Sequence, residues 1–289
     1  MGQDYNIVFT TVDKTAWLQL IVSSYQFYSG SGKGCHVYIS FSDSITVQGL
    51  IPMHLVTLAC LIQFLLDNGW KPYLSSNNKE VDDYIYNDLC FSEYWMGKKN
   101  HVNTTQSSHI FNLWRVIDHE KDLYAKEVER YFKHNYFRNK DLSAISLSLT
   151  EAFYNVFDHA CAKDNAFSLI MYDEEKQVLH AAISDFGIGV AKSVRNYLPE
   201  IEDDKSALLK AVENNFTVKS TGRNKGKGLD NILSCANVSR LCSGRALLVD
   251  NNGERRCYGV NFSFPGTLLY FEVNLAQMED EEILDSFDF

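Results

Sequence analysis

The chain has 289 residues, a length that corresponds to one or two domains. Hydrophobic residues make up 45% and charged residues 22%, which excludes a mostly disordered, collagen-like or disulfide-stapled protein. The net charge of −10 provides no strong basic field for nucleic acid or an anionic membrane. We therefore expect neither of these as a partner.

Cysteine spacing and hydropathy bear on the compartment. The seven cysteines include no C-x-x-C pair, which favours free thiols over a zinc site. The N-terminus lacks the basic and apolar run of a signal peptide. The most apolar segment, 49–66, contains Pro52 and His54 and is barely long enough to span a membrane, so it predicts a buried helix. These features predict a cytoplasmic protein.

The first part of the chain reads as a small α/β domain because strand and helix patterns alternate. The expected strands and helices lie at 35–41, 53–67, 70–75 and 79–89. A charged helix is expected over 114–135. We expect four regions, namely an α/β domain over 1–105, a helical connector over 106–140, a second domain over 141–276 and an acidic tail over 277–289.

The second domain is also predicted to mix helices and strands. A helix is expected over 141–162, and a polar region with short helices is expected over 190–225. A further helix over 228–238 follows a glycine-rich loop. The expected strands are 167–172, 178–184, 245–250, 257–264 and 268–275.

The helix over 141–162 presents two different faces. An apolar stripe recurs at helical spacing, while Glu151, Asn155 and His159 recur at every fourth residue and share another face. Such a row is often an ordinary solvated face. It also suits a magnesium–phosphate site, since Asn offers a hard oxygen to the ion and Glu can take a proton.

Three glycine-containing segments lie further along the chain. Asp185, Gly187 and Gly189 follow a strand pattern, where Asp can accept from a ligand amine and the glycines permit close approach of backbone. The basic loop 222–228 precedes a helix, and helix N-termini favour phosphate. Thr267 enters the last strand, where its hydroxyl can hold a ligand directly or through water.

The order of these motifs resembles the GHKL ATPase family, which includes gyrase, chaperones of the ninety-kilodalton class and histidine kinases. The resemblance covers about residues 115–275. It implies a two-layer α/β sandwich that binds ATP and Mg²⁺, with 190–225 as the lid over the nucleotide. Glu151 matches the general base, Asn155 the Mg²⁺ ligand and Asp185 the residue that binds the adenine amine. The other nucleotide-contacting positions implied are His159, Gly187, Gly189, Lys225, Gly226, Lys227, Gly228, Leu229 and Thr267.

Within that family, the segment TEAFYNVFDHA is most similar to anti-sigma-factor serine kinases. The first domain resembles a STAS domain, although Ile51-Pro52-Met53-His54 stands where a phosphoacceptor serine is usual. The resemblance implies phosphorylation of a partner Ser or Thr, a regulatory or STAS-type protein partner and possible homodimerisation. Two alternatives stay open: an ATP-hydrolysing conformational switch, and a nucleotide-binding module without catalysis.

Overall fold

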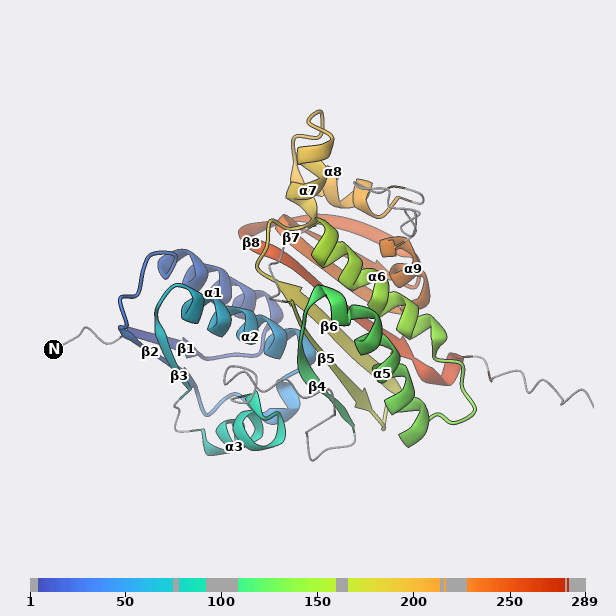
Figure 1. Ribbon diagram of the computed structural model, residues 1–289, viewed down its shortest axis with the longest axis horizontal. Helices are drawn as coiled ribbons and strands as arrows, with labels where there is room; N and C mark the ends of the chain where they lie inside the picture. The colour runs from blue at the N-terminus through green and yellow to red at the C-terminus, as the bar shows by residue number, and fades with distance from the viewer. Residues whose placement is uncertain are drawn as a thin grey trace, which may run out of the picture.

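The computed structural model describes residues 5–74, 78–91, 109–159, 166–213, 216, 228–278 and 280. The chain is a mixed α/β protein with two sheets (Figure 1), which confirms the predicted class. One sheet has three strands in the order β1-β2-β3. The other has five strands in the order β4-β5-β6-β8-β7.

The three-stranded sheet is parallel throughout, and helices cross over between its strands. Its elements are β1 (Tyr5–Phe9), α1 (Lys14–Phe27), β2 (His36–Phe41), α2 (Pro52–Asp67) and β3 (Lys71–Leu74). A short helix, α3 (Lys79–Asp83), follows and continues as a π-helical turn to Asp88. The predicted strands and helices of this region are confirmed. β1 and α1 have no counterpart among the predicted elements.

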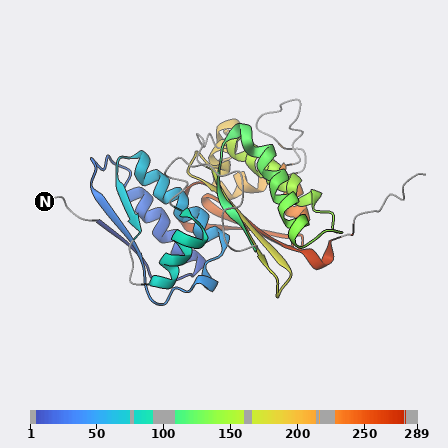
Figure 2. The ribbon, with the colours of Figure 1, turned by 60° about the horizontal axis from the view of Figure 1, so that its bottom comes forward.

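Helix α2 is almost wholly buried because it lies between the two sheets (Figure 2). Its first turn is capped by His54, whose Nδ1 accepts from the Ile51 amide at 3.1 Å. The Nε2 atom of His54 donates to the Val12 carbonyl at 3.1 Å, so the ring is neutral. Burial lowers the pKa of His54 to about 4. No helix among the described residues has the length and apolarity that a membrane crossing requires.

The five-stranded sheet is antiparallel. Its strands are β4 (Ile110–Val116), β5 (Ala166–Asp173), β6 (Val178–Asp185), β7 (Val238–Asn251) and β8 (Glu254–Asn274). Three helices pack on one face: α5 (Lys121–Asn135), α6 (Ser143–His159) and α9 (Gly228–Cys235). Two short helices, α7 (Val190–Tyr197) and α8 (Asp204–Ala211), lie beside one end of the sheet (Figure 1).

Alternating side chains of this sheet build two separate cores. Phe167 and Leu169 of β5 belong to the core that contains α1 and α2, whereas Ile170 belongs to the core under α5, α6 and α9. The same alternation places Leu268 in the first core and Leu269 in the second. The result is four layers: sheet, helices, sheet, helices. The helices α1 and α2 therefore cover the face of the large sheet opposite α6.

Two expectations need correction. The predicted helix over 114–135 begins only at Lys121, as α5, because the segment up to Val116 is the strand β4, in which Leu113 and Val116 are fully buried when it pairs with β5. The three predicted final strands form one long hairpin, β7 and β8, which turns through Asn252 and Gly253, both with positive φ.

Candidate functional site

The end of β6 forms a buried polar corner around Asp185. Asp185 pairs with Thr267 of β8 and is fully buried. Its Oδ1 accepts from the Gly187 amide at 2.7 Å. Its Oδ2 is also buried and has no hydrogen-bond partner within the described residues. A buried carboxylate oxygen without a donor is costly, so this atom is a place where a ligand donor would stabilise the protein.

Burial raises the pKa of Asp185 to about 7. The hydrogen bond from the Gly187 amide and the polar groups of Thr267 lower the pKa and offset part of this effect. Desolvation disfavours the charged form of a carboxyl group, and a donor facing its free oxygen would favour the charged form again. The protonation state of this corner is therefore sensitive to a bound donor near neutral pH.

Hydroxyl groups connect this corner to the start of α7. The Val190 amide donates to Thr267 Oγ1 at 3.2 Å, and the Ala191 amide donates to Ser243 Oγ at 3.3 Å. Ser243 in turn donates to the Gly266 carbonyl at 2.8 Å. The first amides of a helix lack partners inside the helix, and here strand hydroxyls supply them. Ser243 of β7 has no counterpart among the predicted site residues.

Two glycines allow the chain to pack this closely. Gly189 has φ +78°, and a Cβ there would lie 2.4 Å from Ser243 Oγ. Gly266 has φ +111°, and a Cβ there would lie 2.2 Å from the Asp185 carbonyl oxygen. Each position excludes a side chain because protein atoms fill the space. The structure thus gives Gly189 a packing role within the corner, in addition to the predicted role beside a ligand.

Glu151 lies on α6, the helix that covers the same face of the sheet as Asp185. Its neighbours Ala152 and Phe153 are buried in the core, whereas Glu151 itself is half-buried. Burial raises the pKa of Glu151. A partly desolvated carboxylate is a stronger base than one in water, which suits proton abstraction.

Several predicted contacts fall outside the described residues. Lys225, Gly226 and Lys227 belong to this group, and so do the side chains of Asn155 and His159, although their backbone is part of α6. Gly228 begins α9, as expected for a helix after the glycine-rich loop. Leu229 is buried in the core beneath the helices.

No group of three or more His, Cys, Asp or Glu side chains in the described part of the chain is arranged to hold a metal ion. The described cysteines are unbridged. The chain was also compared with protein-family models, with curated proteins and with solved structures, and no significant match was found.

Proposed function

We propose that the chain binds ATP on the α6 face of the large sheet, with Asp185 as the acceptor for the adenine amine. The observation that carries the proposal is the buried Oδ2 of Asp185, which has no donor within the described residues. An adenine 6-amino group is a neutral donor of the required kind. Guanine presents a carbonyl oxygen at the same ring position, so a carboxylate here favours ATP over GTP.

The arrangement of elements supports the same proposal. Asp185 and Thr267 are paired at one end of the sheet, and α6 and α9 pack against each other over the same face. α9 starts at Gly228, directly after the basic glycine-rich loop. The resemblance assigns the phosphates to this loop and Mg²⁺ to Asn155, and Mg²⁺ there would neutralise phosphate charge.

We further propose that the chemistry is phosphoryl transfer to a Ser or Thr hydroxyl of a protein partner. The Glu151 carboxylate would take the hydroxyl proton as the oxygen bonds to the γ-phosphorus. The bond between that phosphorus and the β–γ bridging oxygen breaks, and ADP leaves. The half-buried position and raised pKa of Glu151 support the role of proton acceptor.

One contact favours the conformational-switch alternative. Cys60 of α2 donates from Sγ to the Ser184 carbonyl at 3.3 Å, one residue before Asp185. The first part of the chain therefore touches the strand that ends in the proposed adenine acceptor. A change at this corner has a direct route to α2, so hydrolysis by water coupled to a movement of α2 is the second candidate.

Calorimetric titration with ATP, ADP and GTP tests the binding proposal. Wild-type protein should bind the adenine nucleotides more tightly than GTP. Asp185→Asn should weaken ATP binding by roughly 10- to 100-fold, the cost of one hydrogen bond to a charged group. Asp173→Asn, at a carboxylate elsewhere in the same sheet, is the control. Equal ATP affinity in wild type and Asp185→Asn contradicts the site.

Incubation with γ-labelled ATP and host-cell lysate separates the two chemistries. Label on a specific protein, lost in Glu151→Gln, identifies a kinase and its substrate. Free phosphate without labelled protein, also lost in Glu151→Gln, supports the switch. ATP bound without either product leaves a binding module and contradicts the catalytic proposal.

A further inference from the structure

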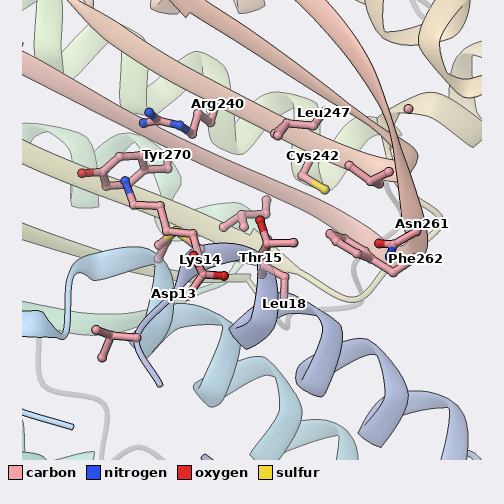
Figure 3. Close-up of a pocket in the computed structure, with 15 residues that line it drawn as sticks. Asp13, Lys14, Thr15, Leu18, Arg240, Cys242, Leu247, Asn261, Phe262 and Tyr270 are labelled. Atoms are coloured by element: carbon pink, nitrogen blue, oxygen red, sulfur yellow. The ribbon is translucent and has the colours of Figure 1, made fainter. Parts of the chain in front are cut away.

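A cavity lies on the face of the large sheet opposite Asp185. It has a volume of about 770 Å³ and opens between the start of α1 and the strands β7 and β8 (Figure 3). Cavities of roughly 300–1,000 Å³ are typical of small-molecule sites. Most of its walls are apolar, formed by Val12, Leu18, Met53, Cys242, Leu247, Val260, Phe262 and Leu268.

Two cations converge at one end of this cavity, next to Tyr270. Figure 3 shows the side chains of Lys14 and Arg240 reaching toward the same ring. Lys14 Nζ lies 5.3 Å and Arg240 Cζ lies 5.9 Å from its centroid. Burial, followed by the charge of Arg240, lowers the pKa of Lys14. Two like charges are thus held close together in a partly desolvated place.

Two carboxylates lie nearby, and the charge of Glu272 raises the pKa of Lys14, which offsets part of the lowering by burial and Arg240. Glu272 accepts from the Tyr270 hydroxyl at 2.7 Å, and Asp13 accepts from the Ala16 amide as the cap of α1. Across the described residues, neither Lys14 nor Arg240 has an ion pair within 4.0 Å, and the buried Nη1 of Arg240 has no hydrogen-bond partner. A buried guanidinium nitrogen without an acceptor is costly.

We propose that this cavity binds an organic anion with an apolar body. Its carboxylate, sulfonate or phosphate group lies between Lys14 and Arg240 and accepts from the free Nη1. Its apolar part lies along the walls that include Leu18, Leu247 and Phe262. The two cations have no ion pair within the described residues and select negative charge in a protein whose net charge is −10, and the apolar walls select against a small inorganic ion. Lys14 and Arg240 do not belong to the proposed nucleotide site, so this proposal does not rest on nucleotide binding.

A fluorescence titration with 8-anilinonaphthalene-1-sulfonate tests the proposal, because this probe has one sulfonate on an apolar body. Wild-type protein should bind it at least about tenfold more tightly than N-phenyl-1-naphthylamine, which lacks the sulfonate. Lys14→Gln and Arg240→Gln should each weaken binding of the sulfonate by about tenfold and leave the neutral probe unchanged. Lys79→Gln removes an exposed lysine at the start of another helix, α3, and is the matched control.

A blocking variant and two competitors locate the site. Thr15 is exposed and lines the cavity, so Thr15→Trp should fill part of it and abolish probe binding while the protein stays folded. Decanoate should displace the probe, and inorganic phosphate at equal concentration should not. Three results would each overturn the proposal. They are undiminished probe binding to Thr15→Trp, equal sulfonate affinity in wild type and the two charge variants, and displacement of the probe by phosphate as effectively as by decanoate.

Discussion

Thr267 and Leu268 are neighbours on β8 and face opposite sides of the large sheet. Thr267 contacts Asp185 and the start of α7, whereas Leu268 lines the cavity that contains Lys14 and Arg240. The proposed adenine corner and the proposed anion cavity therefore share one strand. A ligand that displaces this strand from either face would therefore also move residues of the site on the other face.

The pKa of Asp185 predicts how nucleotide affinity depends on pH. The free site has a pKa of about 7, and an adenine amine donates best to the ionised form. ATP binding should therefore release a proton, and affinity should rise about tenfold between pH 6 and pH 8. Calorimetry in buffers of different ionisation enthalpy measures that proton.

Asp185→Asn is the matched control for this dependence, since its amide does not titrate. Its weaker affinity should be nearly constant over the same pH range. An identical pH dependence in the variant would assign the titration to another group, such as the nucleotide phosphates.

Glu151→Gln is predicted to separate binding from chemistry. Gln has the shape of Glu but cannot take a proton, so turnover should fall by roughly 10²- to 10⁴-fold while ATP affinity changes little. Release of ADP and titration of bound nucleotide are measured on the same preparation. Glu80→Gln, at an exposed carboxylate of α3, should leave turnover unchanged. Turnover that survives in Glu151→Gln would remove Glu151 from the role of general base.

The sequence predicts some residues of the Asp185 corner, but it does not predict which distant residues complete it. Asp185, Gly187 and Thr267 are each usual in a simple turn after or before a strand, so it is their order along the chain, together with the other motifs, that singles them out. Ser243 and Gly266 complete the corner because β7 pairs with β8. No local sequence pattern predicts that Ser243 accepts a hydrogen bond from a helix residue 52 positions earlier in the chain.

The anion cavity is even harder to predict from the sequence. Lys14 and Arg240 are separated by most of the chain and meet only because α1 packs on the far face of the large sheet. In the sequence each is an isolated cation. Periodicity likewise misplaces the start of α5, since the charged stretch around 118–122 continues the polar pattern of the helix and hides the end of β4.

His54 is predicted to reduce stability in mild acid. Its pKa is about 4 in the folded chain and near 6.5 when unfolded, so the unfolded chain takes up a proton first. The contribution of the neutral His54 ring to the free energy of unfolding is complete above pH 6.5 and is lost as the pH falls toward 4. His54→Gln keeps an acceptor and a donor on the side chain but does not titrate. Between pH 7 and pH 5, wild type should lose about 2 kcal/mol relative to the variant.

Urea unfolding at both pH values measures this difference. The comparison with the variant is essential because Asp185 acts in the opposite direction. Its raised pKa makes the folded chain bind the proton first, so Asp185 stabilises the protein as the pH falls from 7 toward 4. A parallel loss in wild type and His54→Gln would show that the buried ring is not the acid-sensitive group.

Gly266→Ala is predicted to damage the Asp185 corner by two separable effects. At φ +111° any side chain adds backbone strain of roughly 1–3 kcal/mol, and here the new Cβ would also lie 2.2 Å from the Asp185 carbonyl oxygen. Gly253→Ala provides the matched control on the same hairpin, because its φ is +89° and no atom lies within 4 Å of the new Cβ. Urea unfolding should show a larger loss for Gly266→Ala than for Gly253→Ala, and only Gly266→Ala should weaken ATP binding. Equal losses in the two variants would mean that the chain relieves the contact by moving β8, so that the corner is less rigid than its packing indicates.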